Sequence, residues 1–207
     1  MSGLFAPAVH GGPFTILTVC SGNLCRSAIA EQLLRARLNG QDFRIISAGS
    51  VANPGQPMPE EAAEMSRRYG GAPDGHRAAP LTAAVVEQAQ LVLGAAREHR
   101  AAAVSLLPRA SRHAFTLTEF ARLSRALLQD DELGGPDRVA GMTPAERVRA
   151  IAAFRGSVRP DAPDADDIED PYRRPLAVYE RSAEQVDAAV SDVVAVLSAG
   201  QREAHHG

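Results

Sequence analysis

The chain has 207 residues, of which 45% are hydrophobic and 23% are charged, and its formal net charge is −3. This length is enough for one well-buried core and too short for two full-sized domains by default. The composition argues against a disordered chain and against a nucleic-acid-binding protein with a globally basic surface. The N-terminal stretch lacks the features of a secretion signal, and no apolar run approaches the roughly 20 residues of a membrane span. We therefore expect a cytoplasmic protein that does not insert into a membrane.

The first predicted element is a short apolar strand at residues 14–19, which stops at Cys20 and the turn residues Ser-Gly-Asn. A helix is predicted from Ser27 to about Asn39, because apolar residues recur there at helical spacing among charged ones. The alternation continues with strands at 43–47, 91–93 and 113–117, and with helices within 59–68, 82–90, 97–107, 118–128 and 177–197. Strands separated by helices predict a parallel sheet with helices on both faces, that is, an α/β fold.

One domain is predicted over residues 14–200, with an N-terminal extension at 1–13 and a C-terminal tail at 201–207. Residues 129–168 are rich in Gly, Pro and Asp and are interpreted as an insertion or a lid-like excursion within that domain. The insertion contains one predicted helix at 144–154, which Thr143 caps and Pro144 opens.

The segment from Cys20 to Arg26, called the Cys20–Arg26 loop below, joins the first strand to the first helix. Parallel α/β sheets bind ligands at the carboxyl ends of their strands, where a helix N-terminus presents free N–H groups to an anion. Gly22 and Asn23 suit the left-handed backbone that a nest of inward N–H groups requires. The loop is therefore predicted to cradle a phosphate, with the N–H dipoles and Arg26 favouring a nucleophilic Cys20 thiolate.

The chain has only two cysteines, and both lie in this loop. Two cysteines separated by four residues provide neither a disulfide framework nor the usual four ligands of a structural zinc site. No metal and no cofactor are therefore expected. A lone cysteine at a strand end is usually a small core residue, but the surrounding Gly22, Asn23 and Ser27 favour a chemical role for Cys20.

This loop resembles the signature C-x-G-N-x-C-R-S of the low-molecular-weight protein tyrosine phosphatases. The matching residues are Cys20, Gly22, Asn23, Cys25, Arg26 and Ser27. The resemblance implies a flavodoxin-like or Rossmann-like three-layer sandwich whose four-stranded parallel sheet has the order 2-1-3-4. It also implies hydrolysis of phosphotyrosine, or of aryl phosphates, in a phosphorylated protein partner, through a cysteinyl-phosphate intermediate.

The resemblance further implies roles for individual residues. Cys20 is the expected nucleophile, Arg26 the phosphate-binding catalytic residue and Asp170 the general acid, with Pro171 stiffening its loop. The expected substrate-binding residues are Ser21, Gly22, Asn23, Leu24, Cys25, Ser27 and Tyr172. Residues 161–170 hold six acidic residues, and most of them are expected to be solvated.

Ser47 and His76 match family residues that hydrogen-bond the loop Asn and hold the cradle open, although either is also compatible with an ordinary turn. Cys25 is expected either to form a reversible disulfide with Cys20 or to be a core residue. Ser21, Asn53 and Arg173 depart from the family pattern, so the preference for phosphotyrosine is left open, as are the partner protein and the oligomeric state.

Two other functions are compatible with the same loop. An arsenate reductase with an internal thiol relay needs resolving cysteines outside the loop, which the chain lacks, so only a reductase that uses an external thiol remains. A non-catalytic module that binds phosphorylated ligands is the second alternative, although it would be expected to have lost Cys20, Arg26 or the acid. Neither alternative predicts binding to nucleic acid.

Overall fold

The computed structural model describes residues 12–38, 40–130, 135–162 and 164–200. Its elements are β1 (Phe14–Cys20), α1 (Arg26–Arg37), β2 (Phe43–Gly49), α2 (Glu60–Arg68), α3 (Ala83–Gln88), β3 (Leu91–Gly94), α4 (Arg97–Leu106), a 3-10 helix (Pro108–Arg112), β4 (Ala114–Thr116), α5 (Leu117–Gln129), α6 (Pro136–Ala140), α7 (Pro144–Ala153) and α8 (Leu176–Leu197). Asn39, where the first helix was expected to end, lies outside the described residues, as do the tail 201–207 and most of the extension 1–13.

The four strands form one parallel sheet in the order β2-β1-β3-β4, which confirms the predicted α/β architecture and strand order. β1 lies inside the sheet and pairs with β2 over its whole length, from Phe14 opposite Phe43 to Cys20 opposite Gly49. Its other edge pairs with β3, and β3 pairs with β4. Because all four strands run in the same direction, their carboxyl ends meet at one edge of the sheet, where Cys20 ends β1.

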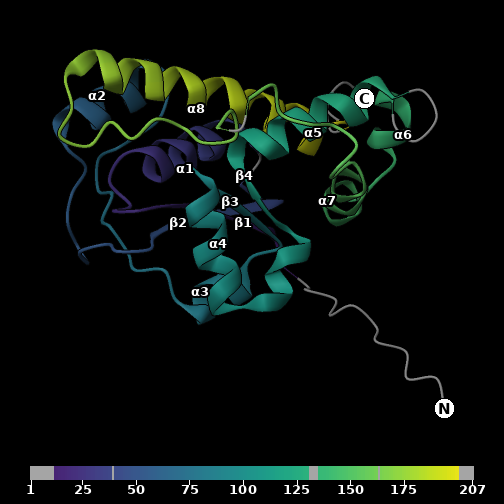
Figure 1. The fold of residues 1–207 in the computed structure, drawn as a ribbon, viewed down its shortest axis with the longest axis horizontal. Coiled ribbons are helices and arrows are strands. Elements are labelled where there is room, and N and C mark those ends of the chain that lie inside the picture. The colour runs from purple at the N-terminus through teal and green to yellow at the C-terminus, as the bar shows by residue number, and fades with distance from the viewer. Residues whose placement is uncertain (1–11, 39, 131–134, 163, 201–207) are drawn as a thin grey trace.

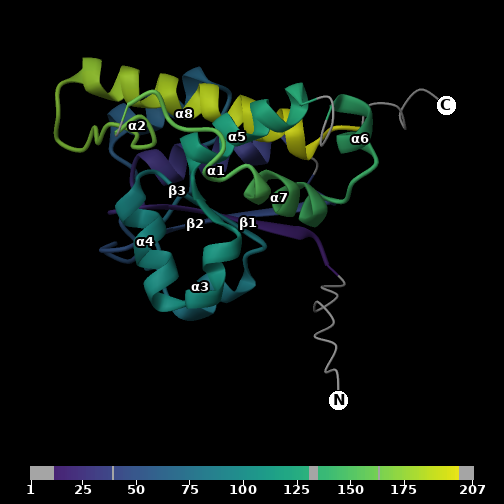
Figure 2. The same cartoon turned by 45° about the vertical axis from the view of Figure 1, so that its right-hand side comes forward.

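Helices cover both faces of the sheet (Figures 1 and 2). Helices α1, α2, α5 and α8 lie on one face, where Ile16 belongs to the larger buried cluster. Helices α3 and α4 lie on the other face, where Leu17 and Val19 belong to the smaller cluster. Successive side chains of a strand point to opposite faces, so a strand buried on both sides is mostly apolar, as β1 is apart from Thr15 and Thr18.

Helix α8 is the longest element and lies along α1 and α5 (Figure 1). Of the predicted apolar stripe of this helix, Val186, Val190, Val193 and Leu197 are fully buried and Val194 is partly buried. None of the helices among the described residues is both long and apolar enough to cross a lipid bilayer.

Several element boundaries differ from the prediction. β2 extends two residues further than expected, to Gly49, because its pairing with β1 continues to Cys20. Neither α6 nor the 3-10 helix Pro108–Arg112 was predicted, because each begins with a proline in a stretch whose composition is typical of loops. Tertiary packing stabilises both segments, through the fully buried Ala110 in the 3-10 helix and Val139 in α6.

The helices of the insertion pack against the ends of α5 and α8 (Figure 2). Buried Arg147 of α7 connects the C-terminal ends of α6 and α8 by donating to the backbone carbonyls of Val139, Ala140, Val196, Leu197 and Ala199. A cation at a helix C-terminus satisfies carbonyls that lack an intrahelical partner. Residues 129, 130, 135–162 and 164–168 do not line the pocket over the Cys20–Arg26 loop.

Candidate active site

The Cys20–Arg26 loop lies at the carboxyl edge of the sheet, between the last residue of β1 and the first residue of α1. Asn23 has a φ of 55°, which is the left-handed conformation expected of the loop. Cys25 occupies the N-cap position of α1 and makes no side-chain capping hydrogen bond. The N–H groups of the first turn therefore stay available to an anion, as the positive end of a helix dipole requires.

The two cysteines of the loop are both reduced and buried. The sulfur of Cys20 lies 3.0 Å from the hydroxyl oxygen of Ser27, which can donate a hydrogen bond to a thiolate. Burial raises the pKa of the Cys25 thiol well above its usual range, and the nearby Cys20 and Asp170 add to this effect. Cys25 therefore stays protonated at neutral pH, which leaves Cys20 as the candidate nucleophile.

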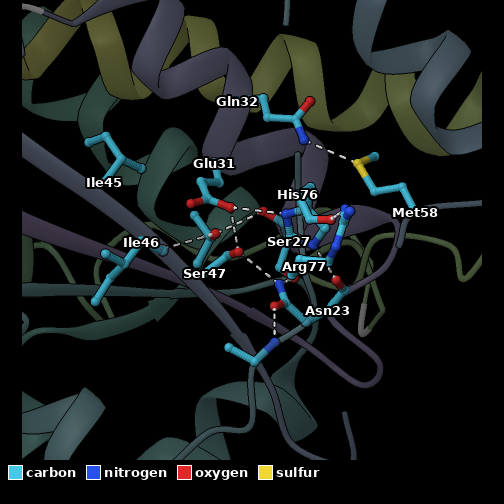
Figure 3. A network of polar contacts seen from close by, with 12 residues as sticks. Asn23, Ser27, Glu31, Gln32, Ile45, Ile46, Ser47, Met58, His76 and Arg77 are labelled. Atoms are coloured by element: carbon cyan, nitrogen blue, oxygen red, sulfur yellow. Dashed lines mark hydrogen bonds and ion pairs between the residues drawn. The ribbon is translucent and has the colours of Figure 1, made fainter. Parts of the chain in front are cut away.

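Asn23 is fully buried, and its side chain connects the loop to two neighbouring segments (Figure 3). Its amide nitrogen donates to the hydroxyl of Ser27 at 3.0 Å and to that of Ser47 at 2.8 Å, and its amide oxygen accepts from the backbone N–H of Ala79 at 2.9 Å. The His76 ring nitrogen Nε2 lies 2.7 Å from the Asn23 carbonyl oxygen. The structure thus brings Ser47 and His76 to the loop.

A buried carboxylate, Glu31 of α1, completes this network. It accepts a hydrogen bond from Ser47 and lies 3.5 Å from Nδ1 of His76 (Figure 3). It also pairs with Arg35 at 2.6 Å. The sequence does carry a signal for it, because Glu31 lies four residues after Ser27 and therefore on the same side of α1. A charged residue in a helix that is buried from Arg26 to Leu34 is rarely fully buried unless it is paired.

Gly49 ends β2 at a point where the loop approaches very closely. A Cβ atom at this position would lie 2.5 Å from the Ser21 carbonyl oxygen, 2.8 Å from the Asn23 nitrogen and 2.9 Å from the Ala52 Cβ. Two of these three atoms belong to the loop backbone, which cannot move aside without opening the cradle. Glycine is required here because there is no room for a Cβ atom, and not because of the backbone conformation, since the φ of Gly49 is not positive.

Arg26 is buried and connects the loop to the segment that precedes α8. One guanidinium nitrogen donates to the Ile168 carbonyl at 3.1 Å, and the other lies 2.9 Å from the Asp170 carboxylate. The structure therefore places Asp170, which is 144 residues further along the chain, beside the loop. Tyr172 follows at the rim of the pocket, with Arg173 stacked on its ring at 5.1 Å and held at a φ of 60°.

Three residues of the acidic run before Asp170 pair with arginines, whereas Asp161 and Asp164 are exposed, as expected. The pairs are Arg122 with Asp166, Arg97 with Asp167 and Arg181 with Glu169. Asp167 also accepts a hydrogen bond from the backbone N–H of Arg97, at the N-terminus of α4. These contacts fix the backbone that carries Asp170, because a carboxylate paired bidentately with arginine has a defined geometry.

A pocket of about 220 Å³ opens over the loop. Its lining includes Cys20, Arg26, Asp170 and Tyr172, together with predicted loop residues Ser21, Gly22, Leu24 and Cys25. Asn23 and Ser27 lie beneath the lining, where they support the loop instead of facing the pocket. Val51, Asn53 and Gln56, from the segment after β2, form a wall.

Unlike Glu31, buried His99 of α4 has no clear sequence signal, and its Nε2 lies 2.9 Å from the Ser21 hydroxyl. Its position at the loop follows from the pairing of β1 with β3, which the local sequence pattern does not show. Among the described residues, no group of three or more His, Cys, Asp or Glu side chains is arranged to hold a metal ion.

Comparison with known families matches residues 15–137 to the model of the low molecular weight phosphotyrosine protein phosphatases. The low molecular weight protein-tyrosine-phosphatase Etp of Escherichia coli K12 is 37% identical over 94 residues, which are 45% of this chain and 62% of Etp. The protein-arginine-phosphatase of Bacillus subtilis is 33% identical over 108 residues, or 51% of this chain and 71% of that protein. The match to Etp thus spans less than two thirds of the relative's length.

Solved structures show the same fold. A low molecular weight protein tyrosine phosphatase from T. tengcongensis superposes with a TM-score of 0.62 at 28% identity, over 87% of this chain and 97% of the other. The YwlE arginine phosphatase from Geobacillus stearothermophilus superposes with a TM-score of 0.65 at 24% identity, over 94% and 99% of the two chains. The second likeness is one of fold alone.

Proposed function

Because the chain belongs to the low molecular weight phosphotyrosine protein phosphatase family, we propose that it hydrolyses aryl phosphate esters, such as phosphotyrosine in proteins, through a cysteinyl-phosphate intermediate. The observation that carries this proposal is one pocket lined by a thiol, a guanidinium and a carboxylate, from Cys20, Arg26 and Asp170. Phosphoryl transfer needs mainly positioning and charge stabilisation, and these three groups supply a nucleophile, an oxyanion clamp and a proton donor.

In the first step, the Cys20 thiolate attacks phosphorus, and an S–P bond forms as the bond between phosphorus and the aryl oxygen breaks. Arg26 and the N–H groups of the loop hold the three equatorial oxygens, and Asp170 gives its proton to the departing aryl oxygen. In the second step, water attacks phosphorus, Asp170 takes up a proton from that water, and the S–P bond breaks. The Ser27 hydroxyl, 3.0 Å from the sulfur, stabilises the thiolate that leaves.

The contact between Arg26 and Asp170 has a consequence for substrate binding. An incoming phosphoryl group uses the same guanidinium, so it takes the place of the Asp170 carboxylate there. Asp170 is half exposed and lies at the pocket lining, so it is free to turn toward the leaving oxygen. Substrate binding and delivery of the acid are therefore coupled at Arg26.

An aryl leaving group fits the walls of this pocket. The buried Leu24 belongs to the lining, and Tyr172 and Val51 are lining residues with exposed apolar side chains. Aromatic and aliphatic walls bury a phenyl ring favourably, whereas the pocket lining offers a single carboxylate, Asp170, to a guanidinium leaving group. This supports phosphotyrosine over phosphoarginine, the substrate class that the Bacillus relative's name indicates.

The test is turnover of p-nitrophenyl phosphate and of a phosphotyrosine peptide. Cys20→Ser is expected to abolish turnover, and Asp170→Asn is expected to reduce it strongly while inorganic phosphate still binds. Asp164→Asn is the matched control, since Asp164 is an exposed acid on the same segment that does not line the pocket.

Substantial activity in Cys20→Ser would exclude the covalent route. Faster turnover of phosphoarginine than of phosphotyrosine would assign the other substrate class. Thiol-dependent reduction of arsenate without ester hydrolysis would instead support an arsenate reductase, and tight phosphate binding without any turnover would support a binding module.

A further inference from the structure

Ser21 and His99 form a polar contact that the mechanism above does not use. Ser21 follows Cys20 in the loop and lines the pocket, and its hydroxyl oxygen lies 2.9 Å from Nε2 of His99. His99 belongs to the first turn of α4, which follows β3, the neighbour of β1 in the sheet. Because both strands are parallel, the start of α4 and the Cys20–Arg26 loop meet at the same edge.

His99 is 1% exposed and carries no charge at neutral pH. Burial lowers the pKa of His99 to about 4, and the positive Arg26 guanidinium contributes in the same direction. The carboxylates of Glu98, Asp170 and Asp167 oppose this shift but do not overcome it. The ring is therefore a neutral imidazole with one N–H donor and one acceptor nitrogen.

The surroundings of the ring select which nitrogen holds the proton. Nδ1 is buried and has no hydrogen-bond partner within the described part of the chain, whereas Nε2 faces both the Ser21 oxygen and a Glu98 carboxylate oxygen at 3.4 Å. A proton on Nδ1 would leave a buried donor unpaired, which is rarer in proteins than an unpaired acceptor. The carboxylate of Glu98 can only accept, so both neighbours are compatible with a proton on Nε2.

We propose that His99 is a positioning residue that donates from Nε2 to the Ser21 oxygen, so that Ser21 gives its own hydroxyl proton to a phosphoryl oxygen bound in the pocket. A hydroxyl donates one hydrogen bond and accepts up to two. His99 occupies one acceptor position of Ser21, and it is the one side-chain partner of that hydroxyl in the described residues. The hydroxyl proton is thus left to a ligand in the pocket.

This arrangement adds a donor to the cradle without adding a charge. Arg26 already supplies the positive charge, and a second cation beside it would be disfavoured by repulsion. A neutral histidine avoids that cost and fixes the rotation of a hydroxyl that would otherwise turn freely. Only the role of this donor in turnover rests on the proposed function. Its role in binding is tested separately, with inorganic phosphate.

The role of the Ser21–His99 pair is tested with four variants and the wild type. The affinity for inorganic phosphate is measured by calorimetry, and the turnover of p-nitrophenyl phosphate is measured in parallel. Ser21→Ala and His99→Leu are each expected to weaken phosphate binding about tenfold, which is typical of a lost hydrogen bond to a charged group. The double variant is expected to be no weaker than Ser21→Ala, because His99 acts only through Ser21. His99→Gln is expected to restore much of the affinity, since its amide can donate from nearly the position of Nε2.

His113→Leu is the matched control. His113 is also a partly buried histidine whose pKa is lowered by burial, and it also has one ring nitrogen without a partner among the described residues. It precedes β4 and therefore lies at the opposite edge of the sheet from the loop. This variant is expected to lose stability but to bind phosphate like the wild type.

Nitrogen-15 NMR of the wild type at pH 7 tests the protonation state of His99 that the proposal requires. The expected spectrum shows neutral His99 with the proton on Nε2, and a proton on Nδ1 or a charged ring would overturn the proposal. Unchanged phosphate affinity in Ser21→Ala would also overturn it. Absence of p-nitrophenyl phosphate turnover, with the pattern of phosphate binding intact, would refute the proposed function and leave the Ser21–His99 pair standing.

Discussion

Replacing Asn23 by alanine removes the side chain that holds the Cys20–Arg26 loop in its shape. The fully buried amide makes three hydrogen bonds, to Ser27, Ser47 and the backbone N–H of Ala79. It also occupies a left-handed backbone position with a φ of 55°. Alanine keeps neither the hydrogen bonds nor the tolerance for this conformation.

The expected loss follows from these contacts. Three hydrogen bonds at a net value of about 1 kcal/mol each give about 3 kcal/mol. Alanine in the left-handed region adds about 1 kcal/mol of backbone strain, the lower end of the range for an L-residue. The free energy of unfolding should therefore fall by about 4 kcal/mol, which lowers Tm by roughly 8–16 °C for a domain of this size.

Thermal unfolding followed by circular dichroism measures this loss, and calorimetry with inorganic phosphate measures the effect on the cradle. Asn23→Gly separates the two contributions, because glycine loses the amide but accepts the left-handed backbone. The Tm of Asn23→Gly is expected to lie between those of the wild type and Asn23→Ala. The larger entropy of the unfolded glycine variant makes the difference in Tm between the two variants smaller. Asn53→Ala is the control for loss of an amide at the pocket wall, with a Tm expected within about 1 °C of wild type, as for other substitutions away from such networks.

An Asn23→Ala variant that melts with the wild type and binds phosphate equally well would refute the reasoning. Equal losses in Asn23→Ala and Asn23→Gly would refute only the part that concerns backbone strain. A lower Tm with normal phosphate affinity would show that the network stabilises the fold without shaping the cradle.

Two further predictions concern the same region. Gly49→Ala is expected to weaken phosphate binding by at least tenfold, because the new Cβ would lie 2.5 Å from the Ser21 carbonyl oxygen, and affinity equal to wild type would show that the loop can shift at no cost. The free energy of unfolding is expected to decrease as the pH is lowered, because His99 is protonated near its ordinary pKa of 6.5 in the unfolded chain and only near 4 in the folded chain. The stability gained from the neutral ring is therefore complete above pH 6.5 and is lost progressively as the pH falls toward 4, and His113 acts in the same direction. Tm measured from pH 7 to pH 4.5 should fall less in His99→Gln than in the wild type, and parallel curves would contradict this assignment.

The sequence by itself determined the local parts of this protein. The loop signature, the apolar β1 run and the helical spacing after Ser27 are short-range patterns, and they predicted a strand, a phosphate cradle and a helix start. The alternation of strands and helices predicted the parallel sheet, and the family resemblance supplied the order 2-1-3-4 that the structure has. The final helix was also evident, because its apolar stripe extends over several turns.

Tertiary structure decided which distant residues reach the loop. His99 comes from the neighbouring strand–helix unit, and Asp170 is held against Arg26 across 144 residues of chain. The arginines that pair with the acidic run come from α4, α5 and α8, and an isolated sequence does not show these contacts. Contacts of this kind depend on strand pairing and on helix packing, and neither leaves a periodic signal in the residues involved. The chemistry of the Cys20–Arg26 loop could therefore be predicted from a few adjacent residues. The groups that orient the loop are brought to it only by the sheet, which gathers the carboxyl ends of its strands at one edge.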